Sequence, residues 1–145
     1  TGQALGKYAP DFGFETILID ERKEYLDECI NSEINKMNLP FQQALKLIPF
    51  DKQTFIVILT YSHDLDRDIL AFCLQKPHAY LGMIGSRRKI EITKKMFVDA
   101  GVGTAQELEK ADMPMGINIH AETPGEIAIS ILAKLIHIKN DQYHE

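Results

Sequence analysis

The residues with the most evident chemistry follow an apolar segment that leads into Gly85 and Ser86 and then into three consecutive cations, Arg87, Arg88 and Lys89. This pattern predicts a strand, a tight turn and the start of a helix. Cations are disfavoured in the first turn of a helix unless an anion lies nearby, because the unpaired N–H groups already carry partial positive charge. Such N–H groups and arginine side chains bind phosphate well. We therefore expect an anion site here; the alternative is a solvated basic face with Ser86 as an ordinary N-cap.

Polar side chains also follow the other apolar segments. Ligands bind at the carboxyl ends of the strands in an open parallel sheet, so we expect these side chains to form one polar rim. They are Asp20 and Arg22 after residues 15–20, Thr60, His63 and Asp66 after residues 53–60, and Thr123 after residues 115–119.

Two of these residues have a specific functional interpretation. Asp20 resembles the acid that binds a ribose hydroxyl in dinucleotide-binding folds, with Gly2 as the last glycine of the preceding turn; the alternative is a turn aspartate. His63 neighbours Asp64 and Asp66, which suits a general base or a ligand contact, or a loop histidine bonded to a carboxylate. The ligand spacing favours no metal site, and no nucleophile motif is present.

The elements that must position these residues alternate along the chain. Hydrophobic periodicity and capping signals predict strands at residues 15–20, 53–60, 79–85 and 115–119, and helices at residues 2–12, 39–48, 64–75, 86–100, 104–110 and 124–138, with residues 22–39 ambiguous. This order predicts an α/β fold: a doubly wound parallel sheet in a single domain over residues 1–145, with residues 55–60 near its middle.

Capping residues and apolar residues predict where these helices begin and which of their faces are buried. Thr104 with Glu107 forms a capping box, and Thr123 with Glu126 forms another. The apolar face of the 86–100 helix is expected to be Ile90, Ile92, Met96 and Phe97, and the 124–138 helix is expected to be central to the core.

The composition excludes several classes of protein. A net charge of −5 argues against general nucleic-acid binding. No apolar run approaches the roughly 20 residues of a membrane span. The two cysteines, Cys29 and Cys73, have no disulfide or metal-ligand spacing, so we expect a cytoplasmic protein.

The chain enters a predicted helix directly after Thr1, which suggests a fragment. In a doubly wound sheet the first strand is central and precedes this helix, so a central position beside residues 15–20 and 55–60 lacks its strand. We expect upstream residues to supply it, or another chain to cover it. The incomplete sheet is also a reason to expect a homo-oligomer.

Three segments together resemble a known family. Residues 60–66, 80–89 and 116–128 read TYSHDLD, YLGMIGSRRK and GINIHAETPGEIA. They are similar to the C-terminal Rossmann domain of the xanthine dehydrogenase accessory factors, the XdhC/CoxI family. The resemblance runs from Gly2 to about residue 138, and the GSRRK and TPxEIA pieces are specific in combination.

The resemblance implies a Rossmann-like domain that binds molybdenum cofactor, as molybdopterin or its dinucleotide, and delivers it to a xanthine dehydrogenase-type apo-enzyme. The phosphate of that cofactor is a fitting anion for the site at Arg87 and Arg88. Three features depart from the family: the cysteine-bearing N-terminal domain and the first strand with its leading glycines are absent, and Asn118-Ile119-His120 stands where Asp-Ile-Gly is common.

Two other functions remain open from the sequence. One is an NAD(P)-dependent oxidoreductase that uses Asp20 for the ribose and His63 as acid or base. The other is a partner-docking module whose nucleotide pocket is vestigial. The first requires a complete glycine motif upstream of Gly2, and the second requires that the pocket bind no cofactor.

Overall fold

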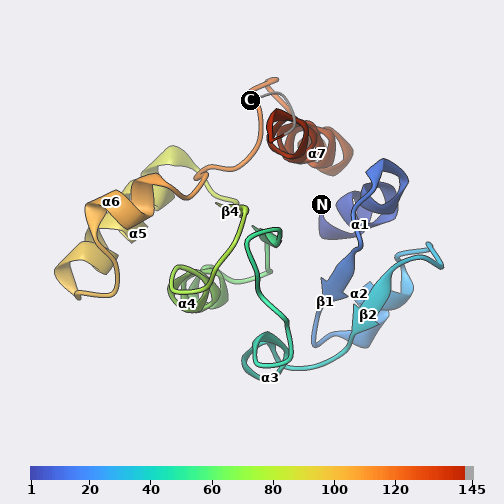
Figure 1. Ribbon diagram of the computed structural model, residues 1–145, viewed down its shortest axis with the longest axis horizontal. Coiled ribbons are helices and arrows are strands. Elements are labelled where there is room, and N and C mark those ends of the chain that lie inside the picture. Colours follow the sequence, from blue (N-terminus) through green and yellow to red (C-terminus); the bar gives the residue numbers. More distant parts are fainter. Residues whose placement is uncertain (143–145) are drawn as a thin grey trace. The chain divides into compact units, whose positions relative to one another are not determined.

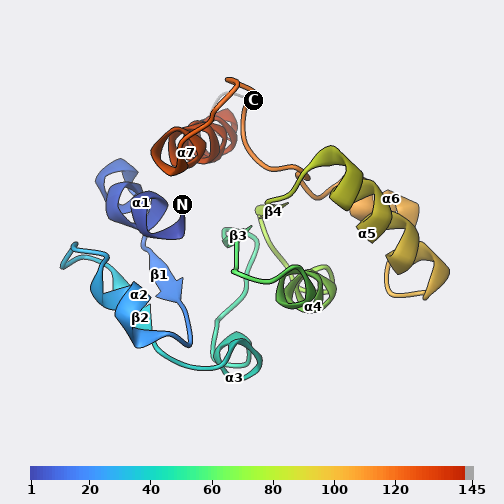
Figure 2. The same cartoon turned by 180° about the vertical axis from the view of Figure 1, so that it is seen from behind.

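The computed structural model describes residues 1–142 and divides into two compact units. Unit 1 comprises Thr1–Ile48 and Ile117–Glu145, and unit 2 comprises Pro49–Gly116. Figures 1 and 2 show the elements from opposite sides. The helices of residues 1–142 are too short or too polar to cross a membrane.

Unit 1 combines a pair of parallel strands with helices. β1 pairs with β2 in the register Ile17↔Asn35, and helices α1 and α7 lie side by side (Figures 1 and 2). Its elements are α1 (Gly2–Tyr8), the 3-10 turn η1 (Ala9–Phe12), β1 (Ile17–Ile19), α2 (Lys23–Asp27), β2 (Asn35–Met37), α3 (Phe41–Leu45) and α7 (Pro124–Asp141). The ambiguous residues 22–39 therefore contain a short helix and a strand.

The end of η1 contacts the last turn of α7 around Gly13. This residue ends η1 in the left-handed conformation, with φ at 86°, which glycine adopts without steric cost. The Lys139 ammonium, from the last turn of α7, donates to the Phe12 carbonyl and lies over the Phe14 ring. In the core of this unit, Cys29 is 2% exposed and its thiol donates to the Gln3 carbonyl.

Unit 2 contains the second parallel strand pair. β3 pairs with β4 in the register Phe55↔Tyr80. Its core includes the fully buried side chains of Leu70, Leu81, Ile90, Leu108 and Cys73. The elements are β3 (Phe55–Ile58), α4 (His63–Cys73), β4 (Tyr80–Met83), α5 (Arg87–Asp99) and α6 (Ala105–Glu109).

β4 holds the inner position in unit 2. It pairs with β3 on one edge and with Asp112 on the other, through a parallel bridge at Gly82. Within residues 1–142, β3 pairs with no strand other than β4, so the place of residues 55–60 near the middle of the whole sheet stays a prediction. An apolar run identifies a covered strand, but it does not determine the order of strands.

A buried polar pair fixes β4. Tyr80 is 4% exposed and its hydroxyl donates to Asp112 Oδ2 at 2.7 Å. Burial, together with the hydrogen bond to Asp112 and the charge of that carboxylate, raises the pKa of Tyr80 far above its ordinary value. The Tyr80 ring lies across Gly82, where a Cβ atom would stand 2.4 Å from the hydroxyl oxygen. Only glycine therefore fits at position 82.

The strand predicted at residues 115–119 is wrong. Gly116 has φ at 102°, a conformation that interrupts an extended segment. The Met115 amide donates to the Met83 carbonyl, whereas the Ile117 amide donates to the Ser130 carbonyl and the Ser130 hydroxyl donates back to the Ile117 carbonyl at 2.6 Å. Residue 117 is therefore attached to helix α7.

The capping predictions are confirmed, and the predicted helix faces are partly wrong. Ser86 caps α5, and capping boxes form at Thr104 and Thr123. α5 buries Ile90 and Phe97, but Ile92 and Met96 are each 47% exposed. α7 extends to Asp141 and buries one face, leaving Ile129 58% exposed.

His120 is the one described residue other than glycine with positive φ, at 54°. Left-handed backbone costs an ordinary residue about 1 kcal/mol. We expect His120→Gly to leave the thermal midpoint unchanged or slightly higher, because relief of strain offsets the greater freedom of the unfolded chain. His120→Val should lower the midpoint, and calorimetry of both variants tests this. A lower midpoint for His120→Gly would show that the imidazole stabilises this turn.

Candidate anion-binding site

Two helices of unit 2 begin at the same edge of the β3–β4 pair. Because the strands are parallel, the connections that follow them leave from that edge. Ser62 caps α4 by accepting from the Leu65 amide, and Ser86 caps α5 by accepting from the Lys89 amide. Each helix has an extended N-cap residue and a full first turn of N–H groups. Such ends favour anions.

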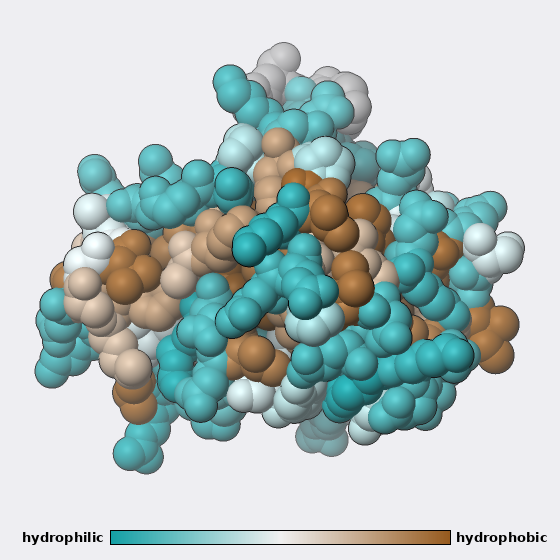
Figure 3. Space-filling view, turned by 90° about the horizontal axis from the view of Figure 1, so that it is seen from below, coloured by the Kyte–Doolittle hydropathy of each residue, from teal (hydrophilic) through white to brown (hydrophobic). Residues whose placement is uncertain are grey.

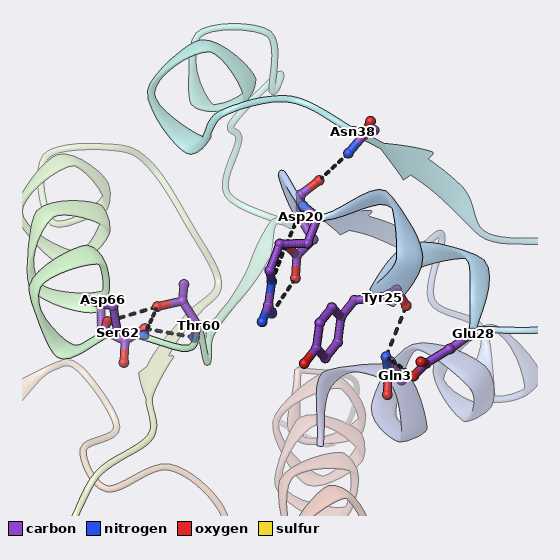
Figure 4. A network of polar contacts seen from close by, with 9 residues as sticks. Gln3, Asp20, Tyr25, Glu28, Asn38, Thr60, Ser62 and Asp66 are labelled. Carbon is purple, nitrogen blue, oxygen red and sulfur yellow. Dashed lines mark hydrogen bonds and ion pairs between the residues drawn. The ribbon is translucent and has the colours of Figure 1, made fainter.

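The β3–α4 connection is organised by Thr60 and Asp66. The Thr60 amide donates to Asp66 Oδ1 at 2.8 Å. The Thr60 hydroxyl donates to the Ser62 carbonyl and accepts from the Ser62 amide. Figure 4 shows the three residues joined in this network. Thr60 and Asp66, two of the predicted site residues, therefore have an internal structural role.

Asp66 is a buried carboxylate. It is 2% exposed in the first turn of α4. Burial raises its pKa above the ordinary 3.8, although hydrogen bonds from Thr60 and the nearby His63 and Arg67 side chains act in the opposite direction. Its oxygen accepts from the Thr60 amide, so this side chain holds the β3–α4 connection in place.

His63 meets the α5 helix start through Lys89. The Lys89 ammonium lies 2.7 Å from His63 Nε2. An ammonium can only donate, so Nε2 is the acceptor in this contact. This contact links the β3–α4 connection to the β4–α5 connection. Lys89 was not among the predicted site residues, although it belongs to the same cationic run.

Gly85, Arg87 and Arg88 complete this edge. Gly85 has φ at 156°, and a Cβ atom there would stand 3.1 Å from Ile90 Cδ1, so the turn requires glycine. Arg87 and Arg88 are exposed, and within residues 1–142 neither side chain forms an ion pair or hydrogen bond. The turn therefore presents two cations beside a helix N-terminus.

The predicted site residues of unit 1 form a separate cluster. Arg22 donates to both oxygens of Asp20, from Nε at 3.0 Å and from Nη2 at 2.9 Å, and its guanidinium lies 3.7 Å from the centre of the Tyr25 ring. Burial of Asp20 raises its pKa, but the hydrogen bonds and charge of Arg22 outweigh it and lower the pKa overall. Asp20 thus holds Arg22 in place.

Gly2 and Thr123 occupy helix starts of unit 1. Gly2 is the first residue of α1. Thr123 caps α7 in a capping box with Glu126, whose pKa is lowered by the backbone N–H groups of Glu122 and Thr123. A single rim that also includes the residues of unit 2 stays a prediction.

Two further features concern the ligands that the described residues could bind. A groove of about 510 Å³ lies between α5 and α6; its lining includes Glu91, Lys95 and Glu109 but no residue from the first turn of α4 or α5. Across residues 1–142, no three His, Cys, Asp or Glu side chains cluster in a way that could hold a metal ion.

The chain is similar to known proteins over almost its whole length. It is 30% identical to the uncharacterized protein YqeB of Escherichia coli (strain K12) over 96% of the chain and 26% of that protein. It is 27% identical to a probable xanthine dehydrogenase subunit of Bacillus subtilis (strain 168), over 93% of the chain and 39% of that protein. The chain thus spans well under half the length of these relatives.

A solved structure agrees with the fold. The crystal structure of a xanthine dehydrogenase from Bacillus halodurans matches with a TM-score of 0.80 and 26% identity, over 96% of the chain and 39% of that structure. The model of the XdhC Rossmann domain family matches residues 1–135. The predicted α/β class is therefore confirmed, and the chain belongs to the XdhC Rossmann domain family.

Proposed function

We propose that this chain is the Rossmann domain of an accessory factor for a xanthine dehydrogenase-type enzyme. In this proposal it acts in the cytoplasm, binds molybdenum cofactor as molybdopterin or its dinucleotide, and delivers it to the apo-enzyme. Two relatives of the chain carry the name xanthine dehydrogenase, which supports a partner of that kind.

The observation that carries the proposal is the cationic edge of unit 2. Arg87 and Arg88 stand beside the N-terminus of α5, and Lys89 joins this helix to His63 at the start of α4. Cations gain nothing from a helix N-terminus unless an anion is present. A phosphate would be stabilised by both the guanidinium groups and the backbone N–H groups.

The side chains at this edge fit the phosphate end of the cofactor. Ser86, Arg87 and Arg88 offer hydroxyl and guanidinium donors, and Gly85 allows the backbone to approach closely. The two thiols of the chain, Cys29 and Cys73, are buried, so these residues are unsuited to hold the molybdenum end. When bound, the cofactor supplies the redox-active metal of the recipient enzyme. This domain would hold and orient its anionic part.

The oxidoreductase alternative rests on Asp20. Both oxygens of that carboxylate accept from Arg22, so the residue that would bind a nicotinamide dinucleotide ribose is already engaged. We therefore favour cofactor delivery over hydride transfer.

We expect Arg87→Ala/Arg88→Ala to weaken binding of molybdenum cofactor freed from a molybdenum hydroxylase by about 10- to 100-fold, because charge-assisted hydrogen bonds are lost. Anaerobic titration followed by pterin fluorescence measures this. Binding to the natural protein should also weaken as salt rises.

The matched control is Lys94→Ala/Lys110→Ala, which removes the same charge away from the α5 helix start. It should bind as the natural protein does. Equal affinity of the natural protein and the Arg87→Ala/Arg88→Ala variant would assign the arginines to a solvated face and contradict the proposal.

A further inference from the structure

Helix α7 of unit 1 has a second apolar side, turned away from the core of its own unit. The core side of the helix is centred on the buried Ile131 and Leu135. Successive residues of a helix are turned by about 100°, so a different set of residues lies on the opposite side. We call this set the α7 outer face, and its members are Glu126, Ile129, Ala133, Ile136, His137 and Asn140.

The centre of the α7 outer face is free of charge. Ile129 is 58% exposed, more than any other large apolar side chain on a helix of residues 1–142, and Ala133 and Ile136 are partly exposed beside it. Exposed apolar side chains occur elsewhere on the chain, where Figure 3 shows them among hydrophilic ones. A helix that is apolar on two opposite sides is typical of one with a packing partner on each side.

The apolar residues of this face are placed symmetrically about the middle of the helix. α7 runs from Pro124 to Asp141, so Ile129 and Ile136 lie equally far from its midpoint, and Ala133 lies next to it. If two copies of α7 pack antiparallel about a twofold axis through this midpoint, each Ile129 meets the partner's Ile136. The small side chain of Ala133 allows the two helices to approach closely at the axis.

The two charged or titratable side chains of the face are also placed to match a second copy. Glu126 and His137 lie along the same edge of the face, one near each end of α7. In the antiparallel pair, Glu126 lies on the same side as the partner's His137 and within about 3 Å of its level along the helix axis. A parallel pair would instead place each Glu126 beside the other, so these charges favour the antiparallel arrangement.

Glu126 and His137 are both suited to such a contact. One oxygen of Glu126 accepts from the Glu122 and Thr123 amides, at 2.9 and 3.1 Å, which fixes the carboxylate at the edge of the face. These N–H groups lower the pKa of Glu126, so the group is negatively charged near neutral pH. Within residues 1–142, His137 forms no hydrogen bond or ion pair, and it is exposed.

We propose that the α7 outer face is a twofold interface, on which a second copy of this chain packs its own α7 in antiparallel orientation. The contact uses one helix of unit 1 from each copy. A pair of helices of this length, about 27 Å, forms a small interface, so we expect a dimer that dissociates on dilution. This inference does not depend on the proposed cofactor binding.

Sedimentation velocity of the natural protein over a range of concentrations should show a dimer in equilibrium with the 16.5 kDa monomer. Ile129→Glu should weaken association about tenfold or more, because it buries an unpaired charge at the centre of the interface. Ile92→Glu is the matched control, since Ile92 is an exposed isoleucine on α5 of unit 2, and it should associate as the natural protein does. A natural protein that stays monomeric at every concentration, or an unchanged Ile129→Glu variant, overturns the proposal.

Substitutions of His137 test the charged edge of the interface. His137→Glu places an acid opposite the partner's Glu126 and should weaken association about three- to tenfold. His137→Lys keeps a cation there and should associate at least as well as the natural protein. Equal association of the two variants overturns the antiparallel register.

Cysteine cross-linking tests the position of the twofold axis. Ala133→Cys places two thiols next to each other across the axis, whereas the thiols of Asn140→Cys lie about 22 Å apart along it. With a mild oxidant, only Ala133→Cys should form a covalent dimer on a non-reducing gel, because the natural Cys29 and Cys73 are buried. Equal cross-linking of both variants, or none of Ala133→Cys, overturns the proposed packing. Circular dichroism and thermal melts establish that each variant is folded.

Discussion

Replacing Gly82 by alanine should lower the free energy of unfolding by about 3 kcal/mol, through overpacking and the loss of a buried hydrogen bond. A Cβ atom at this position would stand 2.4 Å from the Tyr80 hydroxyl oxygen and 2.8 Å from two ring carbons. The ring is buried and held by Asp112, so it moves only by breaking that bond. The expected fall in the thermal midpoint is about 6–12 °C.

Gly125→Ala is the matched control. Gly125 lies in the first turn of α7, and a Cβ atom added there would meet no atom within 4 Å. Alanine is the better helix former, so this variant should be neutral or slightly stabilised. Differential scanning calorimetry of both variants is the measurement. Equal midpoints for Gly82→Ala and the natural protein would show that Tyr80 can relocate at little cost.

Asp66→Ala should destabilise the protein by about 1–3 kcal/mol, because the Thr60 amide loses its buried acceptor. Asp66→Asn retains a side-chain oxygen that can accept from Thr60, so it should lose less stability near neutral pH. Urea unfolding of both variants compares them. Equal losses would show that the negative charge of Asp66, rather than its acceptor oxygen, stabilises the loop.

Asp66 should also make the free energy of unfolding depend on pH. The pKa of Asp66 is raised in the folded protein, so the folded state binds this proton more tightly than the unfolded state. The contribution of Asp66 to the free energy of unfolding therefore decreases as pH rises from the ordinary value of 3.8 through the raised pKa. Asp66→Asn lacks this group. The difference in stability between natural protein and variant should change in that interval and be flat above it.

Features set by neighbouring residues were predictable from the sequence. The caps at Ser86, Thr104 and Thr123 depend on a side chain and an amide three residues away, so short sequence patterns identify them. The parallel α/β class also followed from the alternation of elements. The strand at residues 115–119 failed because its apolar spacing gave no sign of the positive φ at Gly116.

Features set by distant residues were not predictable. Four apolar residues of α5 share a wide arc, and periodicity does not tell that Ile90 and Phe97 face the core while Ile92 and Met96 do not. One local contact was missed as well: the engagement of Asp20 with Arg22, two residues further on, depends on side-chain conformation, which no short pattern gives. The Tyr80–Asp112 pair spans 32 residues and gave no local signal.

The two cysteines offer a way to follow the two units separately. Cys29 belongs to unit 1 and Cys73 to unit 2. Burial raises the pKa of both thiols, that of Cys73 to about 11, so neither reacts readily while its surroundings are folded. A thiol reagent followed by peptide mapping thus reports the opening of each unit on its own. Equal labelling rates at Cys29 and Cys73 would indicate that both units open in one cooperative event. The two cysteines already in the chain are the reporters, so no residue has to be introduced.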